Sequence, residues 1–463
     1  MFDAAVIGAG PAGAVTAISL ARHGYRVALF DAGSRIPGRY DRLPPYAIEF
    51  LKLQELLPAA EHALVSMPPG SLTRWQENDP RFTPGPHHIL DRDCFDRALV
   101  AIARRASVSL FATRAHRPSF FGGRWRIHSV SGDVESRFLI DASGRASTQP
   151  RQGAATAAIC GILTGVHLPE MRTEGLPDGW VWGAPVAATS AAVSVFLARK
   201  HCAGLTQATR EALYRQTLQP TLLFRKCAKA NLAGPLVVRD ATPRAHPDPV
   251  AANRVTTGDA CIALDPLLSH GLQIAVRLST HAAAVCHTVL SGAGAPDAAI
   301  EFFRTGQRST LAQHQAGAAR LYNEHRTYAE EPFWLERSRI EPSPEPPADI
   351  RPEALYRLSA LVRPEPVAAL LPNGVIGCVE GFSHPSYARP VAFLSGINAA
   401  AFLPALAVPA TLAELVKRCE RLIGPAQAQK VLDGLVRNRV LIPAARVQQT
   451  VRDARVPALA VAR

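Results

Sequence analysis

The sequence lacks any pattern of cysteines or histidines that would hold a metal ion. Its eight cysteines include no CxxC pair and no spacing typical of metal ligands. The fifteen histidines are dispersed, apart from the adjacent pair His87 and His88. This usage fits reduced, mostly buried thiols in a cytoplasmic protein. We therefore predict no metal centre and a cytoplasmic location.

Long hydrophobic runs are also absent. The most apolar helical stretch, near residues 272–290, carries Arg277 and two histidines, which argues against a membrane span. The first residues read as a buried strand, so we expect no signal peptide. With 48% hydrophobic and 19% charged residues among 463, the composition indicates a soluble globular protein of two or three domains.

Lysine is scarce, because only 6 of the 51 lysines and arginines are lysines. The net charge is +13, but the arginines are scattered along the chain and no basic run is interleaved with aromatic residues. This distribution argues against a nucleic-acid-binding protein. It leaves open a positive surface that attracts an acidic partner protein or the phosphates of a cofactor.

Glycine is concentrated at the start of the chain, in the stretch VIGAGPAG at residues 6–13. A strand over residues 2–7 is expected to run into a helix over about residues 11–22, with Gly8, Gly10 and Gly13 at the turn. Residues without a side chain let the backbone approach a bulky anion closely, and the helix N-terminus favours negative charge. This pattern predicts a phosphate-binding turn.

The segment that follows strengthens this interpretation. Gly24 ends the helix, and YRVALFD reads as a second strand with Asp31 at its end, 18 residues after Gly13. A Rossmann unit presents a carboxylate to a ribose 2′-hydroxyl at about this distance. The combination of strand, helix, second strand and terminal aspartate predicts dinucleotide binding.

Three further stretches indicate which dinucleotide binds. They are ILDRDCFDRALVAIARRA at residues 89–106, FLIDASGRAS at 138–147 and TTGDACIALDPLLSHGLQIAVRLS at 256–279. Together with GAGPAG they resemble, in order and spacing, the FAD-binding motifs of the flavin-dependent monooxygenase and halogenase superfamily. The resemblance covers roughly residues 1–340, and four ordered motifs are more specific than one.

The resemblance implies an α/β fold, in which a Rossmann-type FAD-binding domain is interleaved with a β-sheet substrate domain. Asp259 would accept hydrogen bonds from the ribityl hydroxyls, and Pro266 would stiffen the loop along the flavin. The helix beginning near Gly271 would direct its positive end at the N1–C2=O edge of the ring. The predicted FAD-binding residues are Gly8, Gly10, Pro11, Ala12, Gly13, Asp31, Arg92, Ala142, Gly144, Asp259, Pro266, Gly271 and Leu272.

Further stretches resemble the halogenase-like branch of the superfamily. PDGWVWGAP at residues 177–185 resembles its WxWxIP signature, and EEPFWLERS at 330–338 resembles its FWxxR element. RYDRLPPYAIEFLKLQEL at 39–56 resembles the halogenase segment K-x-G-E-S-L-P-P, but alignment on the prolines puts Gly38 at the position of the lysine. That lysine handles hypochlorous acid in halogenases. The resemblance therefore implies oxygen transfer from a flavin C4a-hydroperoxide, with O2 as co-substrate, rather than halogenation.

The candidate catalytic residues follow from the same alignment. Asp41 aligns with the halogenase glutamate, and His270 precedes the helix expected at the flavin edge, where it could accept a proton near neutral pH. The stretch DASGR lacks the DG motif of hydroxylases that bind a nicotinamide, and there is no second GxGxxG. Both absences favour reduced flavin from a separate reductase or another donor.

The rest of the chain is expected to form a separate C-terminal module. A hairpin is predicted at Asn373-Gly374, a capping box at Thr411 and Glu414, and a helix pair after it. The pattern resembles a small α+β winged-helix-type module, with a structural cap as the alternative. The predicted divisions are residues 1–150 and 251–340 for the FAD domain, 151–250 for the substrate sheet, 341–354 for a linker and 355–463 for the module.

These features favour one substrate class. The branch that lacks the lysine and keeps the halogenase scaffold hydroxylates a tryptophan in a protein precursor during tryptophylquinone biogenesis. A protein or peptide substrate is thus implied, alone or with another maturation enzyme, and the module is available to dock it. The alternatives are a free indole or phenol, a geranylgeranyl-reductase-like activity, against which WVWGAP argues, and a non-enzymatic FAD-binding scaffold.

Overall fold

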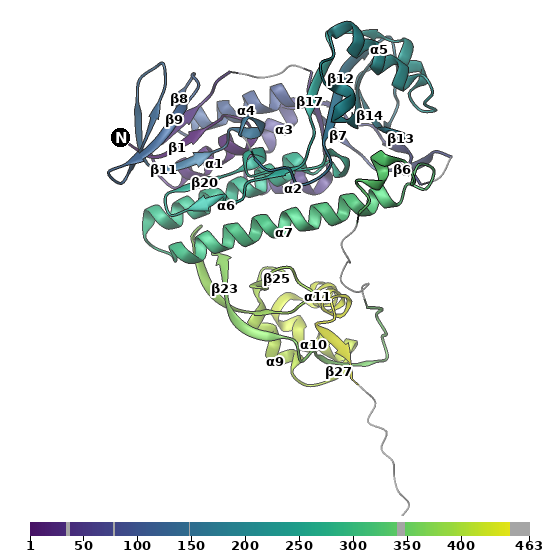
Figure 1. Ribbon diagram of the computed structural model, residues 1–463. Helices are drawn as coiled ribbons and strands as arrows, with labels where there is room; N and C mark the ends of the chain where they lie inside the picture. The colour runs from purple at the N-terminus through teal and green to yellow at the C-terminus, as the bar shows by residue number, and fades with distance from the viewer. Residues whose placement is uncertain (34–37, 77–78, 148, 340–347, 445–463) are drawn as a thin grey trace, which may run out of the picture. The chain divides into compact units, whose positions relative to one another are not determined.

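The computed structural model describes residues 1–33, 38–76, 79–147, 149–339 and 348–444. Its contacts divide the chain into two compact units. The first comprises residues 1–343 and 368–378, and the second comprises residues 344–367 and 379–463 (Figure 1). No helix in the described part of the chain combines the length and apolarity that a bilayer crossing requires.

The first sheet has the Rossmann arrangement that the sequence predicted. Its strand order is β19-β20-β11-β1-β2-β8, and the pairs β20–β11, β11–β1, β1–β2 and β2–β8 are parallel. The carboxyl ends of β1, β2 and β11 therefore meet at one edge, where ligands bind in this fold. The strands are β1 (Phe2–Ile7), β2 (Val27–Phe30), β8 (Ser109–Phe111), β9 (His116–Phe121), β10 (Arg124–His128), β11 (Val134–Asp141), β19 (Val250–Ala251) and β20 (Arg254–Thr256).

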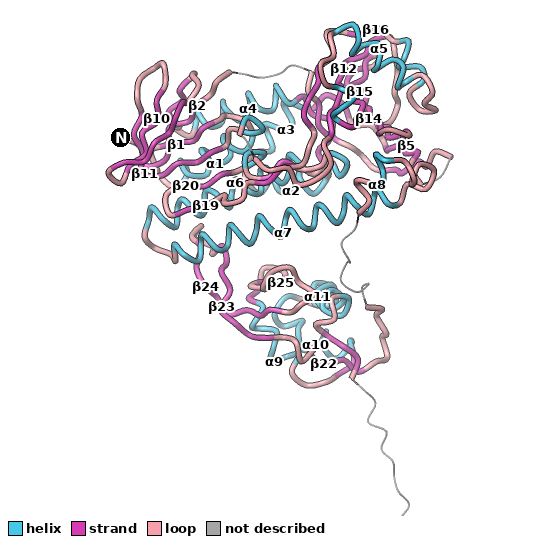
Figure 2. The backbone as a smooth tube through the Cα atoms, viewed as in Figure 1, coloured by secondary structure: helices cyan, strands magenta, loops and turns pink. Residues whose placement is uncertain are grey.

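Helices pack on this sheet through small and branched apolar residues. Helix α1 (Pro11–Arg22) contacts both α4 (Arg92–Arg105) and α6 (Gly271–Ser291), and α6 contacts the long helix α7 (Pro296–Asn323) (Figures 1 and 2). Most of α1 is buried, as its run of alanine, valine and isoleucine predicts. The core under these helices fixes the positions of the α1 and α6 N-termini at the sheet edge.

A second eight-stranded sheet belongs to the first unit. Its order is β16-β12-β15-β14-β13-β5-β6, with β17 also paired to β12. One face packs on α5 (Gln207–Leu218), and the other carries Trp75, Trp180 and Phe196. The strands are β5 (Gly70–Arg74), β6 (Arg81–Pro84), β12 (Thr156–Thr164), β13 (Met171–Leu176), β14 (Gly179–Ala187), β15 (Ser190–Ala198), β16 (Asn231–Leu232) and β17 (Val237–Asp240). The sheet therefore also recruits residues 70–84, outside the predicted range 151–250.

Small elements complete the first unit. A three-stranded sheet has the order β3-β7-β4, and strands β5 and β6 of the second sheet lie between β4 and β7 in the sequence. The elements are β3 (Tyr40–Leu43), α2 (Pro45–Leu53), α3 (Leu57–Ala63), β4 (Leu64–Ser66), β7 (His88–Asp91), β18 (Arg244–Ala245), β21 (Ile262–Ala263) and α8 (Pro332–Leu335).

The second unit combines a three-stranded sheet with two amphipathic helices. The sheet order is β27-β22-β28, and the predicted capping box at Thr411 and Glu414 starts α10. The stretch HPSYARPVAFLSG at residues 384–396, which the sequence predicts as one strand, forms only the two-residue strand β25. The elements are β22 (Leu355–Leu358), β23 (Arg363–Leu370), β24 (Ile376–Ser383), β25 (Phe393–Leu394), β26 (Ile397–Asn398), α9 (Leu403–Leu406), β27 (Ala410–Thr411), α10 (Leu412–Ile423), α11 (Pro425–Arg437) and β28 (Leu441–Pro443).

The tip of the β23–β24 hairpin corrects the predicted domain boundary. The hairpin forms at Asn373-Gly374 as predicted, but residues 368–378 belong to the first unit. Ile376 is fully buried there, its N–H donates to Thr288 Oγ1 at 2.8 Å, and its C=O accepts from the Ala295 N–H at 3.1 Å. The module predicted as residues 355–463 thus contributes a segment to the core of the first unit. Residues 445–463 of that prediction lie outside the described residues.

Candidate active site

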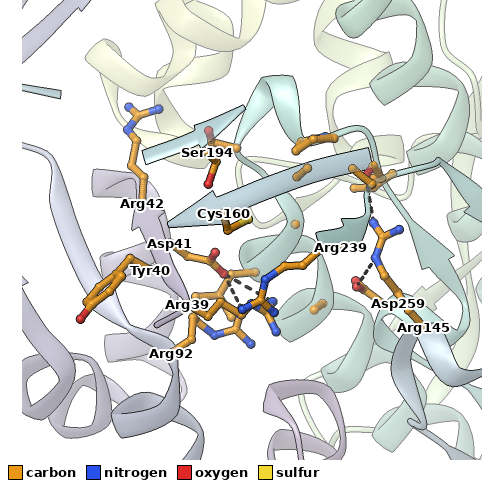
Figure 3. Close-up of a pocket in the computed structure, with 18 of the residues that line it drawn as sticks. Arg39, Tyr40, Asp41, Arg42, Arg92, Arg145, Cys160, Ser194, Arg239 and Asp259 are labelled. Carbon is orange, nitrogen blue, oxygen red and sulfur yellow. Dashed lines mark hydrogen bonds and ion pairs between the residues drawn. The ribbon is translucent and has the colours of Figure 1, made fainter. Parts of the chain in front are cut away.

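A single cavity of about 1250 Å³ runs through the first unit. It begins at the carboxyl ends of β1, β2 and β11 and extends to the aromatic face of the second sheet (Figure 3). All of the predicted FAD-binding residues line it except Gly13, and Asp41 lines it as well. Residues that are distant in the sequence are thus brought together around one space.

The glycine-rich turn has the geometry of a phosphate cradle. Gly8 has a φ of +102°, and a Cβ atom there would collide with the Ala142 carbonyl. A Cβ atom at Gly13 would collide with the Gly8 carbonyl, whereas one at Gly10 would have no protein atom within 4 Å. Gly8 and Gly13 therefore serve backbone packing, while Gly10 keeps open the space in front of α1. That helix begins without a side-chain cap, so its first N–H groups are available to an anion.

The carboxylate of Asp31 lies at the same end of the cavity, immediately after β2. Its Oδ1 accepts a hydrogen bond from the Gly33 N–H at 3.0 Å, which fixes the turn after the strand. Phe30, Ala32 and Thr113 line the cavity beside it. Asp31 thus lies at the end of β2 and lines the cavity, and its role in binding a ribose stays a prediction.

Asp259 is held by an arginine that the sequence analysis missed. The Arg145 Nε lies 3.2 Å from Asp259 Oδ2, and the same guanidinium donates to the Thr242 carbonyl at 3.1 Å. Both residues are labelled in Figure 3. Arg145 is in the stretch DASGR, so the motif contained the residue, but only the fold brings it to Asp259. A carboxylate held in this way is positioned to accept hydroxyl hydrogen bonds from a ligand in the cavity.

Asp41 lies among arginines. It forms an ion pair with the buried Arg92 and a second one, at 3.6 Å, with Arg39. Figure 3 shows Arg239 gathered with these residues. Burial alone would raise the pKa of Asp41, but the charges of Arg92 and Arg39 more than offset it and hold this pKa below its usual value. Asp41 is therefore ionised and fixed in place, which suits a structural anchor for Arg92 better than a group that gains and loses a proton.

The loop before α6 forms another wall of the cavity. Asp265, Pro266, Leu267 and Ser269 line it, and Gly271 and Leu272 follow at the start of the helix. Like α1, α6 has no side-chain cap, so its first N–H groups face the loop without a side-chain acceptor. The positive end of the α6 dipole is therefore at this wall of the cavity, and its contact with a flavin ring stays a prediction.

His270 is not brought into this wall. It is the residue before α6, but it is not among the residues that line the cavity. Its half-buried ring lies against Tyr46 and His314, with ring centroids 6.2 Å away in both cases. Burial and the charge of Arg42 lower the pKa of His270. The geometry does not favour the predicted role of His270 at the flavin edge.

The far end of the cavity is a chamber with aromatic walls. Trp180 and Phe196 are stacked, with centroids 3.8 Å apart, and Trp75 lies edge-on to Trp180. Ala158, Cys160, Ala192 and Ser194 line the cavity from the neighbouring strands, and Figure 3 shows the side chains of Cys160 and Ser194 there. The sequence analysis did not identify this space, although small residues at alternate positions, Ala158 and Cys160 on β12 and Ala192 and Ser194 on β15, could have indicated it. Trp75 had no such signal because β5 is far away in the sequence.

Gly38 also lines the cavity, at the position where halogenases have lysine. Its φ is +74°, and a Cβ atom there would lie 3.4 Å from Cγ1 of Ile162 on β12. A side chain at position 38 would therefore point at the second sheet. Among the described residues, no group of three or more histidines, cysteines or carboxylates could hold a metal ion.

Comparisons with known proteins define the class of the fold. A family model described as an NAD(P)-binding Rossmann-like domain matches residues 6–43. A solved flavin-dependent halogenase, CmlS, is 17% identical, with a TM-score of 0.77 over 95% of each chain. The first unit thus has the fold of a flavin-dependent halogenase, which confirms the resemblance that the motifs predicted.

Two other proteins are more specific relatives. The chain has a TM-score of 0.74 and 23% identity with the peptidyl tryptophan dihydroxylase QhpG, described as essential for tryptophylquinone cofactor biogenesis, over 94% of this chain and 99% of that one. It is 27% identical over 335 residues to a tryptophan 2-halogenase of Chondromyces crocatus. That match covers 65% of this chain and 63% of the halogenase, less than two thirds of its length. The two named proteins both act on tryptophan, one as a peptidyl dihydroxylase and the other as a halogenase.

Proposed function

We propose that the protein is an FAD-dependent monooxygenase that hydroxylates an electron-rich aromatic ring. The observation that carries this proposal is the continuity of one cavity from the glycine-rich turn to the aromatic chamber. Bound FAD, once reduced, supplies the electrons with which dioxygen is activated. The cradle fits FAD, since Gly10 leaves the α1 N-terminus open for a diphosphate and Asp31 and Asp259 offer acceptors for ribose and ribityl hydroxyls.

Hydroxylation is favoured over halogenation by the residue at position 38. Gly38 leaves the cavity wall without the amino group that halogenases place there, and Lys52 is located on α2, a different element, and does not line the cavity. The nearby cations Arg39 and Arg92 are engaged with Asp41. An arginine is also no substitute for a lysine amine that must react, because its guanidinium stays protonated and is a poor nucleophile.

The proposed substrate is a tryptophan side chain in a protein precursor during quinone-cofactor biogenesis. The similarity to the peptidyl tryptophan dihydroxylase over nearly the whole of both chains supports this substrate class. The chamber walls support it too, because Trp180 and Phe196 offer faces and edges against which an indole packs favourably. Free indole or phenol is the second candidate, and the same walls accommodate it.

The test uses the purified full-length chain with FAD, a flavin reductase with NADH, and oxygen. Tryptophan-containing peptides, indole and a phenol are each incubated with chloride and bromide present, and the products are analysed by mass spectrometry. We expect addition of oxygen and no halogen, with the peptide as the best substrate. A halogenated product would contradict the hydroxylase proposal. Efficient turnover of free indole and none of any peptide or protein would contradict the peptidyl substrate.

A further inference from the structure

The carboxylates around the cavity differ in whether an arginine neutralises them. Asp41 and Asp96 pair with Arg92, Asp259 pairs with Arg145, and the others in ion pairs are Asp93, Asp240 and Glu324. Asp31 is located beside the glycine-rich turn, at the opposite end of the cavity from the aromatic chamber, and Asp79 is exposed. Asp265 differs from all of these, because it is buried in the cavity wall and no described arginine or lysine lies within 4.0 Å of its carboxylate.

Asp265 is positioned by two hydrogen bonds. The Leu267 N–H donates to Oδ1 at 3.0 Å, and the Tyr322 hydroxyl on α7 lies 3.2 Å from each carboxylate oxygen. Tyr322 is itself buried, in contact with Trp75 and Trp334. A carboxylate can accept about four hydrogen bonds. These two donors therefore fix its orientation and leave lone-pair positions for a proton.

The surroundings also favour the protonated form of this carboxyl group. Burial raises the pKa of Asp265, and the hydrogen bond from Leu267 and the more distant charge of Arg337 offset this only in part. Burial, followed by the neighbouring Asp265, raises the pKa of Tyr322 well above its usual value, so the hydroxyl stays protonated and acts as the donor. A carboxyl group whose pKa is shifted toward neutrality is better matched to proton transfer than an ion-paired aspartate.

We propose that Asp265 accepts the proton that the aromatic ring loses when it is hydroxylated, and that Tyr322 is a positioning residue for it. This inference rests on the proposed function. In the step, a ring carbon gains a bond to oxygen and its C–H bond breaks. The electron pair of that bond restores the aromatic ring, and the proton passes to the Asp265 carboxylate and then to water. The co-reactants are dioxygen, two electrons from reduced flavin and two protons, one carried by the reduced flavin and one taken from water, so that one oxygen atom enters the ring as hydroxyl and the other leaves as water.

The other residues near this loop fit the role less well. His270 does not line the cavity, and Asp41 is held as an anion by Arg92 and Arg39. The competing interpretation is that Asp265 only caps the short helical turn after it, since its side chain accepts the Leu267 N–H. An amide at this position keeps that acceptor and the shape of the side chain but cannot take up a proton, which separates the two interpretations.

The first experiment measures the proton on Asp265 without turnover. Infrared difference spectra of the wild type minus D265N, recorded across a pH series, report the carbonyl band of a protonated carboxyl group. We expect a band whose midpoint lies above the ordinary range for aspartate. The Tyr322 hydrogen bond lowers the pKa of Asp265, so Y322F should move the midpoint to higher pH. The absence of such a band, with Asp265 titrating in the ordinary range, would overturn the proposal.

The second experiment measures hydroxylation of N-acetyltryptophan amide by FAD-loaded protein reduced with dithionite and then mixed with oxygen. Removing a proton acceptor should lower the product yield of D265N by about a hundredfold or more, while oxygen is still consumed to hydrogen peroxide. In Y322F the rise of the single-turnover hydroxylation rate with pH should move to higher pH. The matched control is D297N, since Asp297 is an exposed carboxylate on the same helix as Tyr322 and does not line the cavity, and its yield should equal that of the wild type.

The outcomes separate this inference from the function on which it rests. If the wild type hydroxylates the probe and D265N does so equally fast, only the assignment of Asp265 is overturned. If the wild type hydroxylates neither the probe nor any aromatic peptide, the proposed function and the inference both fail. If D265N no longer binds FAD, the Y322F variant tests the proposal instead. Its pH profile and its infrared midpoint should both lie at higher pH than those of the wild type, and an unshifted pH profile overturns the proposal.

Discussion

Substitution of two neighbouring glycines, Gly10 and Gly13, should change two different properties of the protein. An added side chain at Gly10 meets no protein atom within 4 Å, and its φ of −71° suits any residue. An added Cβ at Gly13 collides with the Gly8 carbonyl. We therefore expect Gly10→Val to affect FAD binding and Gly13→Ala to affect the free energy of unfolding.

The magnitudes follow from these contacts. Gly10→Val would block the approach of a phosphate to the first N–H groups of α1, and hydrogen bonds to charged groups contribute about 1.5–3 kcal/mol each. Losing two of them corresponds to at least a hundredfold in FAD affinity, at about 1.4 kcal/mol for each factor of ten. The cost to unfolding without FAD should be about 1 kcal/mol or less, the range for a poorer N-cap. Gly13→Ala should cost about 1–3 kcal/mol through overpacking.

The assay is denaturant unfolding with and without FAD, followed by tryptophan fluorescence. All five tryptophans are in residues 1–343, so the fluorescence reports the unfolding of the first unit alone. FAD at a hundred times its Kd should stabilise the wild type by about 2.7 kcal/mol, and the same concentration should stabilise Gly10→Val by only about 0.4 kcal/mol. If Gly10→Val keeps the full FAD-dependent stabilisation, the phosphate cradle is not where we place it. A Gly13→Ala variant as stable as the wild type would refute the packing argument.

Three further predictions test the core, the pH dependence and the second unit. Ile376→Ala should lower the unfolding free energy of the first unit by about 2–5 kcal/mol in the same fluorescence assay, because Ile376 is fully buried in its core. An unchanged unfolding free energy would place the hairpin tip outside that core. Burial lowers the pKa of His314 and of His325 to about 4, so the stability that these neutral rings confer is present above pH 6.5 and is lost as the pH falls toward 4. Unfolding curves over this range should show the loss, and His314→Gln should reduce it. Replacing the exposed Lys417 and Arg421 on α10 with glutamate should raise the KM for an acidic protein substrate and leave the turnover of N-acetyltryptophan amide unchanged. Equal effects on both substrates would exclude docking through this face of the helix.

The packing of the hairpin tip against the first unit limits how the role of the second unit can be tested. A chain that ends near residue 340 would lack Ile376 and its hydrogen bonds to Thr288 and Ala295. It would therefore expose part of the core of the first unit. Loss of activity in such a chain would not distinguish docking from unfolding. Charge reversal on α10 in the full-length chain avoids this problem, because the exposed side chains of Lys417 and Arg421 contribute nothing to that core.

Sequence alone determined the features that depend on a few neighbouring residues. The turn with Gly8 and Gly10, the aspartate after β2 and the capping box at Thr411 were all predicted at the positions where they occur. Each is set by local physics, since positive φ values, helix ends and strand ends are fixed within a few residues. The ordered motifs likewise predicted the Rossmann sheet and the superfamily resemblance.

Tertiary structure alone decided which side chains meet. Trp75 joins Trp180 only because β5 adds to a sheet built mainly from strands more than 70 residues later, and Asp265 gains Tyr322 only because α7 packs behind its loop. The same packing turns His270 away from the cavity, although it precedes the helix that the sequence analysis placed at the flavin edge. Strand order and helix packing depend on contacts across the whole chain. A local pattern therefore predicts that a residue is near a site, but not which neighbour its side chain faces.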